Sequence, residues 1–189
     1  MSPATNPTQV GGGASPDIDV KAMRQRARQG IENGAVTKDY EANKEVVIRL
    51  LNEALATEIV CVLRYRLHHF MANGILSEPV AAEFMEHAVQ EQEHADSIAE
   101  RIVQLGGKPD FNPQTLVSRS HAEYVEVDSL SDMIKENLVA ERIAIESYRA
   151  MVNYIGDKDT TTRRMLEEIL AVEEEHAEDL SSLMQGMPK

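Results

Sequence analysis

Two short motifs that could hold metal ions occur in this chain of 189 residues. The first pairs Glu91 with His94 and the second pairs Glu173 with His176, with two residues between the partners in each. On an α-helix, three residues advance about 300° and about 4.5 Å, which puts the carboxylate and the imidazole on one face, one turn apart. Each motif could therefore give two ligands to one ion.

A glutamate lies upstream of each motif, within a stretch whose apolar residues recur at helical spacing. Glu58 precedes Glu91 by 33 residues, and Glu141 precedes Glu173 by 32 residues. Burying an unpaired carboxylate costs roughly several kcal/mol, so core packing alone gives no reason for an acid at Glu58 or Glu141. The matched spacing indicates two copies of one helical hairpin, offset by 82 to 83 residues.

These two hairpins supply candidate ligands for a single buried centre. Six ligands are enough for two ions, and four carboxylates balance the charge of two divalent ions. Carboxylate and imidazole ligands without a thiolate favour Fe(II) or Mn(II) over softer metals. We therefore expect two iron ions per subunit, which Mn or Zn can replace. The expected ligands are Glu58, Glu91, His94, Glu141, Glu173 and His176.

The elements that must position these ligands are expected to be four long helices. Aromatic residues make up 4% of the chain and there is no Trp, which favours an all-α fold. Residues 106–128 contain two prolines and are long enough to cross the length of a bundle. We therefore predict a ferritin-like four-helix bundle with one long crossover. Its helices should span residues 43–72, 77–106, 129–156 and 157–185, with Ser77, Ser129 and either Asp157 or Asp159 as capping residues.

The chain is expected to divide into an N-terminal extension, residues 1–40, and the bundle, residues 41–189. Residues 1–16 are rich in Pro, Gly, Ser and Thr and have little to bury, which predicts a mobile tail. A short helix is expected over residues 17–33. Its basic residues are either a solvated helix face or an arm that binds phosphate groups, and they are Lys21, Arg24, Arg26 and Arg28.

The composition limits the classes of function. With 42% apolar residues, the chain suits one domain with a sizeable core. Its formal charge of −13 repels nucleic acid on average and attracts cations. Cys61 is the only cysteine, so an internal disulfide and a zinc-ribbon site are excluded, and we expect it to be a core residue. The chain has no signal-peptide pattern and no apolar run of membrane length, so we expect a cytoplasmic protein without a membrane partner.

Four stretches of the sequence resemble bacterioferritin, within the ferritin-like superfamily. They are LNEALATEIVCVLRYRLHH, EQEHADSIAERIVQLGG, NLVAERIAIESYRA and ILAVEEEHAEDL, and the likeness covers about residues 43–185. The resemblance implies that all six candidate ligands match the ferroxidase ligands of that family. It also implies a catalytic role for Tyr65, which falls two turns after Glu58, where the family carries a tyrosine beside its di-iron site. Tyr148 stands in the same relation to Glu141.

Two departures from bacterioferritin change these expectations. Gln92 stands where bacterioferritins place the methionine that binds haem, so we expect no haem. Only 13 residues follow His176, which leaves no sequence for the fifth helix of 24-subunit ferritins. In this respect the chain is similar to Dps-like proteins that keep a bacterioferritin-type site in each subunit. That similarity implies a homo-oligomeric shell, with twelve subunits as the expected number.

The remaining histidines are expected to have lesser roles. His87 lies one turn before Glu91 on the same face, and it could hydrogen-bond a metal ligand rather than the metal. The other three are expected to face solvent or another subunit, and they are His68, His69 and His121.

Three functions remain open at the level of the sequence. The resemblance favours iron oxidation and storage or detoxification in a hollow shell, where O2 or H2O2 takes electrons from Fe(II) at the di-iron site. A shell could instead protect DNA, because many copies of the basic segment at residues 21–28 would add weak contacts. The third alternative is a di-iron or di-manganese enzyme that consumes peroxide.

Overall fold

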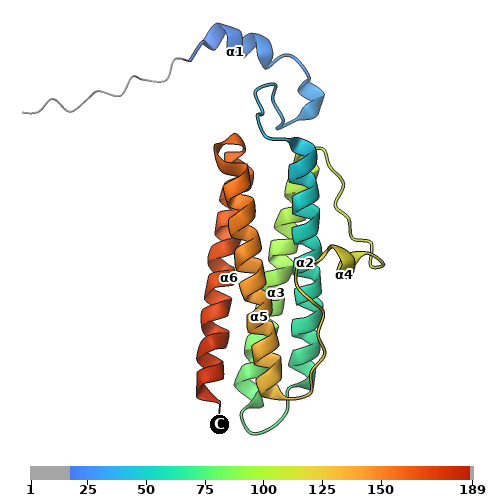
Figure 1. Ribbon diagram of the computed structural model, residues 1–189. Helices are drawn as coiled ribbons and strands as arrows, with labels where there is room; N and C mark the ends of the chain where they lie inside the picture. The colour runs from blue at the N-terminus through green and yellow to red at the C-terminus, as the bar shows by residue number, and fades with distance from the viewer. Residues whose placement is uncertain (1–17, 188–189) are drawn as a thin grey trace, which may run out of the picture.

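Four long antiparallel helices form a bundle in the computed structural model, which describes residues 18–187 (Figure 1). The helices are α2 (Lys44–Met71), α3 (Ser77–Gln104), α5 (Leu130–Ile155) and α6 (Thr160–Gly186). Shorter elements are α1 (Val20–Arg26), η1 (Ile31–Asn33), α4 (Leu116–Arg119) and η2 (Gly156–Lys158). The described residues contain no strand, and the predicted all-α bundle is confirmed. The tail predicted for residues 1–16 lies outside the described range.

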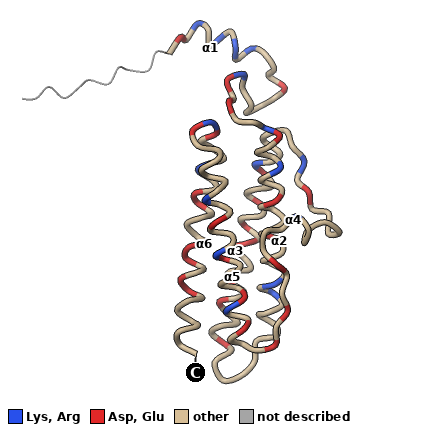
Figure 2. The backbone as a smooth tube through the Cα atoms, viewed as in Figure 1, with Lys and Arg blue, Asp and Glu red and all other residues tan. Residues whose placement is uncertain are grey.

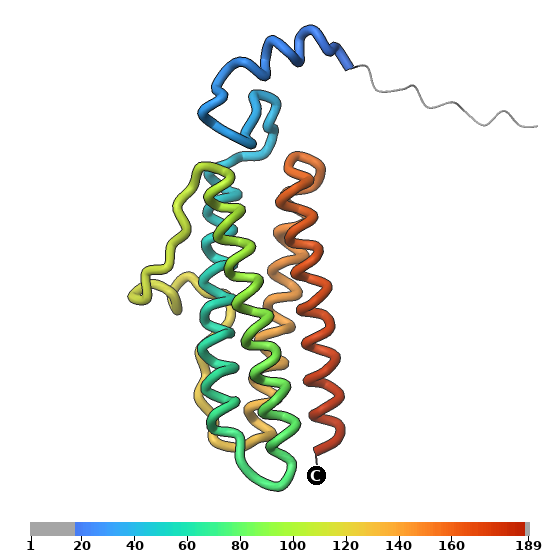
Figure 3. Tube along the Cα trace, turned by 180° about the vertical axis from the view of Figure 1, so that it is seen from behind, coloured from blue at the N-terminus to red at the C-terminus, as the bar shows by residue number. Residues whose placement is uncertain are grey.

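The bundle consists of two hairpins joined by one long connection. Helices α2 and α3 pack along each other, and α5 packs along α6 in the same way. The connection leaves the end of α3, passes down the outside of α2 through α4, and reaches the opposite end of the bundle before α5 begins (Figure 3). The single crossover predicted from the weakly periodic stretch is therefore present.

The helices begin at polar caps in three cases out of four. Side-chain oxygens of Asn43, Ser129 and Asp159 accept hydrogen bonds from amides in the first turns of α2, α5 and α6. Ser77 was expected to cap α3, and this prediction is wrong. The backbone turns at Gly74, where φ is 108°, and Ser77 is already the first helical residue. Its hydroxyl donates to the Gly74 carbonyl at 2.8 Å instead of accepting from the helix.

Buried side chains form two main apolar clusters, one on each side of a polar layer. The first cluster includes Leu51, Ile98 and Leu166, and the second includes Phe84 and Met133. Along every long helix the candidate ligands fall between the residues of these two clusters. Each fully buried apolar side chain contributes about 1.5–3 kcal/mol, which offsets the cost of burying the polar layer.

The N-terminal segment meets the bundle at the end where α6 begins. The Tyr40 hydroxyl donates to Asp159 at 2.7 Å, and the Arg101 guanidinium pairs with the same carboxylate at 2.9 Å. The expected helix over residues 17–33 is shorter than predicted, because α1 ends at Arg26 and Gly30 adopts the left-handed conformation (φ 65°). Figure 2 shows α1 and its basic residues beyond the end of the bundle. Among residues 18–187, none of the helices has the length and apolar character that crossing a membrane requires.

Candidate metal centre

The structure brings all six predicted ligands together in the polar layer at the middle of the bundle. Each is at least nine-tenths buried, with His94 the most exposed at 8%. Their ligand atoms form two groups, and within each group all of these atoms lie within 4.8 Å of one another. Glu91 and Glu173 belong to both groups, so they can bridge two ions. The first group is completed by Glu58 and His94, and the second by Glu141 and His176.

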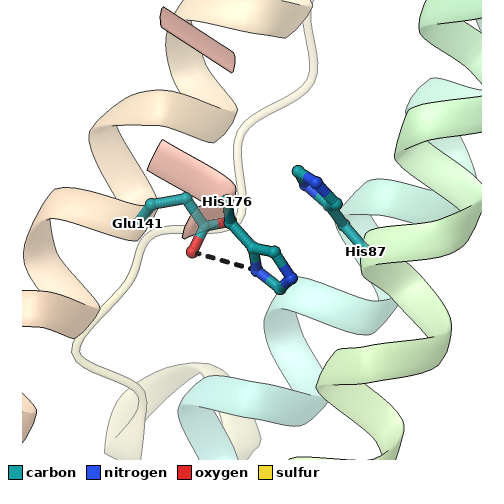
Figure 4. Close-up of side chains that lie close together, drawn as sticks. All are labelled: His87, Glu141 and His176. Carbon is teal, nitrogen blue, oxygen red and sulfur yellow. Dashed lines mark ion pairs between the residues drawn. The ribbon is translucent and has the colours of Figure 1, made fainter. Parts of the chain in front are cut away.

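Both imidazoles direct Nδ1 at three carboxylates. His94 Nδ1 lies 3.0 Å from Glu173, 3.3 Å from Glu91 and 3.4 Å from Glu58. His176 Nδ1 lies 3.7 Å from Glu91, 3.8 Å from Glu173 and 4.0 Å from Glu141. The last of these pairs is drawn in Figure 4. Both arrangements place one nitrogen and three carboxylates around a common space.

The orientation of His176 is fixed by Gln90, which sequence reasoning did not identify. His176 Nε2 lies 2.8 Å from the side-chain oxygen of Gln90. An amide oxygen only accepts, so Nε2 carries a proton, and Nδ1 is the nitrogen that could bind an ion once the ring is neutral. The only sequence signal was a polar residue directly before Glu91, on the flank of the ligand face.

Unpaired acceptor atoms at this layer fit a pair of cations. Most buried polar atoms in proteins find a hydrogen-bond partner, yet several here have none among the described residues. A divalent cation would satisfy carboxylate and imidazole lone pairs together. The unpaired atoms are Glu58 Oε2, Glu91 Oε1, Glu141 Oε2, both oxygens of Glu173, and His176 Nδ1.

Protons balance the charge of this layer when metal is absent. Burial, followed by the charge of Glu91, raises the pKa of Glu58 to about 8, and burial also raises the pKa of Glu141 well above its usual value. Burial opposes ionisation of Glu91 as well, but its contacts with Glu58, His176 and His94 lower its pKa overall. The outer carboxyls therefore hold protons at neutral pH while the shared carboxylates are ionised.

The pKa values of both imidazoles are raised, although burial alone would lower them. Burial disfavours the charged ring of His94, but its contacts with Glu173, Glu58 and Glu91 raise its pKa to about 12. The pKa of His176 is raised to about 9 against the same effect of burial, by Glu173 and Glu91. Two protonated rings then oppose two ionised carboxylates, so the centre without metal is close to neutral. Two divalent ions would give the same balance with all four carboxylates ionised.

Two buried tyrosines hold the outer carboxylates, and each does so across the two hairpins. Tyr65 on α2 donates to Glu141 on α5, and Tyr148 on α5 donates to Glu58 on α2. The sequence placed each tyrosine two turns from the glutamate of its own helix. The structure pairs each with the glutamate of the other helix.

His87 lies against the centre, and among the described residues it has no hydrogen bond to the four glutamates. Its ring stacks on His176, with centroids 4.0 Å apart and planes 20° apart (Figure 4). Its Nδ1 lies 3.1 Å from the Tyr65 hydroxyl. Burial, with a smaller contribution from His176, lowers the pKa of His87 to about 3. The predicted hydrogen bond to a metal ligand is therefore replaced by a bond to the tyrosine that holds Glu141.

His68 was expected to face solvent or another subunit, and this prediction is wrong. Its side chain is fully buried, with Nδ1 3.2 Å from Asn137 Oδ1. The same amide oxygen accepts from Arg64, whose guanidinium also reaches the carbonyl of Glu123 in the crossover at 2.7 Å. The crossover covers this face of α2, which helical periodicity alone does not reveal.

The remaining predicted residues belong to neither ligand group. Cys61 is buried in the second apolar cluster, as predicted for a core residue. Gln92 is exposed and its amide donates to Asp96 at 2.9 Å. The side chain of His121 is 32% exposed, with Nδ1 2.6 Å from the hydroxyl of Ser147.

Comparison with known families and sequences places these residues in a wider group. The ferritin family, described as a ferritin-like domain, matches residues 48–189. Bacterioferritin from Mycobacterium tuberculosis is 31% identical over 144 residues, which are 76% of this chain and 86% of that protein. The DNA protection during starvation protein of Pyrococcus furiosus is 27% identical over 147 residues, with 76% and 80% covered.

Solved structures give the same grouping. A dodecameric thioferritin, the bacterioferritin-related protein from Bacteroides fragilis, superposes with a TM-score of 0.75 at 32% identity, covering 77% of this chain and 88% of that chain. Dps from Thermosynechococcus elongatus has a TM-score of 0.72 at 20% identity over 75% of this chain and 91% of that chain, which shows a shared fold.

Proposed function

This chain belongs to the ferritin family of ferritin-like proteins, and on that premise we propose that it oxidises Fe(II) with O2 or H2O2 and stores or detoxifies the Fe(III). The observation that carries the proposal is the pair of overlapping ligand groups that share Glu91 and Glu173. Shared carboxylates place two Fe(II) ions side by side, and a two-electron oxidant needs two such one-electron donors at once.

The reaction balances with either oxidant. Two Fe(II) and O2 with two protons give two Fe(III) and H2O2, whereas two Fe(II) and H2O2 with two protons give two Fe(III) and two water molecules. Glu58 and His94 would bind one Fe(II), and Glu141 with His176 would bind the other. The outer carboxyls lose their protons on binding. Burial of the whole layer excludes bulk water from the site.

Tyr65 and Tyr148 support this chemistry by orienting carboxylates. A phenol that donates to one oxygen of a ligand leaves the other oxygen for the ion. In Glu58 and Glu141 the tyrosine contacts Oε1, and Oε2 has no hydrogen-bond partner among residues 18–187. Both tyrosines are therefore assigned as positioning residues for the outer ligands.

A homo-oligomeric shell is part of the proposal, because storage needs an enclosed space. Large apolar side chains are exposed on the C-terminal half of α2 and the turn that follows, and a soluble monomer rarely exposes such a group together. We expect this surface to pack against other copies. Twelve subunits are proposed on the likeness to the thioferritin, which is described as dodecameric. The exposed residues are Leu63, Phe70, Met71, Ile75 and Leu76.

The test is aerobic Fe(II) addition to the metal-free protein. We expect oxidation faster than in protein-free buffer, about one O2 consumed per two Fe(II) when the product is H2O2, and iron that stays with the protein on gel filtration. Oxidation no faster than in buffer would refute the ferroxidase function. Release of O2 from added H2O2 with bound manganese, and no retained iron, would favour the peroxide-consuming enzyme.

DNA protection is a second candidate, favoured by the basic residues of the N-terminal segment. They are all exposed and lie beyond the end of the bundle (Figure 2), and they are Lys21, Arg24, Arg26 and Arg28. A gel shift should be lost when all four are replaced by Gln and should weaken steeply with salt. A shift that survives the fourfold substitution would exclude these residues as the contact.

A further inference from the structure

A second cluster of possible ligands lies beside the centre and shares none of its six residues. Glu83 and His87 project from α3, and Asp179 projects from α6. Their ligand atoms lie within 4.8 Å of one another. His87 Nε2 is 3.4 Å from Glu83 Oε1 and 4.0 Å from Asp179 Oδ2. The His87 side chain is 2% exposed, whereas those of Glu83 and Asp179 are 31% and 46% exposed.

Hydrogen bonding indicates that Nε2 of His87 carries a lone pair. With metal in the centre Glu141 is ionised and only accepts, so the single hydroxyl proton of Tyr65 goes to Glu141. The Tyr65 oxygen must then accept from Nδ1 of His87, which lies 3.1 Å away. A neutral imidazole has one N–H, so Nε2 has none.

This lone pair faces the carboxyl groups of Glu83 and Asp179 without a hydrogen bond to either. Both separations from Nε2 exceed the 2.7–3.2 Å typical of an N–H···O hydrogen bond, and no hydrogen bond to Nε2 is present among the described residues. This nitrogen therefore faces two carboxylate oxygens, and all three can donate an electron pair to a cation. A cation is what such a set binds, and one imidazole with two carboxylates suits Fe(II), Mn(II) or Zn(II).

The cluster lies between a surface groove and the centre. The groove has a volume of about 400 Å³ between the start of α3 and the end of α6, and its lining includes Pro79, Glu83, Asp179 and Leu183. On the side of the cluster that faces the centre, His87 has a ligand atom within 4.8 Å of ligand atoms of both Glu141 and His176 (Figure 4). His87 thus belongs to the cluster with Glu83 and Asp179 and also borders the dinuclear centre.

We propose that Glu83, His87 and Asp179 form a third divalent-cation site, through which Fe(II) exchanges between the groove and the dinuclear centre. The two carboxylates balance the charge of the ion. Three protein ligands leave coordination positions for water, which allows the ion to move on. The role in Fe(II) exchange rests on the proposed function, whereas cation binding itself rests on the geometry of these three residues.

The number of cation sites can be measured as Co(II) bound per chain, with the full chain in the absence of oxygen. We expect three Co(II) per chain in the wild type, two in E83Q/D179N, and three in the control E86Q/E178Q. The control removes the same charge from exposed positions on the same two helices. Anomalous diffraction from Co(II)-soaked crystals should place the third ion at His87. Two ions in the wild type, or three in E83Q/D179N, would overturn the site.

The exchange role has a separate readout. In E83Q/D179N we expect the Fe(II) concentration for half-maximal oxidation to rise about tenfold, with the maximal rate retained, whereas E86Q/E178Q should match the wild type. Loss of the third Co(II) without a change in Fe(II) dependence would overturn the exchange role. If the wild type binds three Co(II) but oxidises no Fe(II), the proposed function fails and the third site stands.

Discussion

Tyr148 on α5 donates a hydrogen bond to Glu58 on α2, and Tyr65 on α2 makes the reciprocal contact with Glu141 on α5. Both tyrosines are buried. Each outer carboxylate is therefore held by a side chain from the other hairpin. The two halves of the centre cannot be oriented independently, because packing of the hairpins sets both pairs at once.

Tyr148→Phe should weaken metal binding by about tenfold, because an outer carboxylate loses the donor that orients it. The cost to folding should be about 1 kcal/mol, the usual value for one hydrogen bond. Zn(II) titration of the metal-free protein measures the first effect and chemical unfolding the second. Tyr154→Phe is the control, since Tyr154 lies on the same helix and is 49% exposed. Equal Zn(II) affinities in the two variants would contradict the positioning role.

Replacing the two outer carboxyls, Glu58 and Glu141, should abolish rapid Fe(II) oxidation without destabilising the metal-free protein. Their raised pKa values keep them protonated at neutral pH, so the neutral amide of E58Q/E141Q is a close substitute. Its Tm without metal should stay near that of the wild type. Wild-type oxidation kinetics in this variant would show that Glu58 and Glu141 are not ligands of the reacting iron.

The shared carboxylates, Glu91 and Glu173, should behave differently when replaced by Gln. Their lowered pKa values keep them ionised beside protonated His94 and His176. E91Q/E173Q therefore leaves two buried imidazolium charges without carboxylate partners. Breaking a buried ion pair costs about 3 kcal/mol or more. Unfolding of the metal-free protein should therefore need clearly less denaturant. Equal stability of the two double variants would show that the protons are distributed otherwise.

Metal affinity should rise with pH between about pH 6 and pH 8. The Glu58 carboxyl, with its pKa raised from 4.5 to about 8, must lose a proton before it can bind an ion. Between these two values the folded protein holds a proton that the unfolded chain has lost. The contribution of Glu58 to the stability of the metal-free protein is therefore complete below 4.5 and is lost as the pH rises through about 8.

Calorimetric Zn(II) titrations at three pH values, in two buffers of different ionisation enthalpy, measure both the affinity and the protons released. E58Q/E141Q should release fewer protons than the wild type. An affinity that does not change with pH would contradict the assignment of protons to the outer carboxyls.

The sequence predicted which six side chains gather in the polar layer, because their signal is local to each helix. Spacing of three residues places Glu91 and His94 on one face whatever the helix packs against. Which carboxylates belong to both ligand groups depends on where four helices meet, and so does the partner of each tyrosine. Gln90 and His68 were missed for the same reason. Their surroundings come from α6 in one case and from the crossover in the other, neither of which periodicity along one helix describes.

Asp159 should anchor the end of the bundle as both a helix cap and an ion-pair partner. Asp159→Asn keeps a capping oxygen but leaves the Arg101 charge buried without its carboxylate, which should cost about 3 kcal/mol. Tyr40→Phe removes one hydrogen bond and should cost about 1 kcal/mol. Denaturant unfolding of both variants measures these losses, and a smaller loss in Asp159→Asn than in Tyr40→Phe would contradict the ion-pair role.

Asp159 should also make the free energy of unfolding depend on pH in the acid range. Burial works against its ionisation, but hydrogen bonds from Thr162 and Tyr40 and the charge of Arg101 lower the pKa of Asp159 below 3.8. The unfolded chain therefore takes up this proton first, so the stabilisation is present above 3.8 and is lost as the pH falls through the folded-state value. Asp159→Asn should flatten the acid limb of the stability profile. An unchanged acid limb would show that other carboxylates cause it.

Assembly should depend on the exposed apolar surface at the C-terminal half of α2. Twelve chains of 21.0 kDa give about 252 kDa, which light scattering of the wild type should return. Phe70 is 71% exposed and Ile75 is fully exposed, so F70D/I75D should cost the isolated fold little while it places charges in a contact between copies. We expect the variant to have a smaller mass at unchanged helix content, with Fe(II) still oxidised but the Fe(III) no longer retained.

A wild-type mass near 504 kDa would require a different shell of twenty-four chains. A wild-type monomer or dimer would remove the storage space and favour a di-metal enzyme instead, because the centre lies within one chain and does not need the shell.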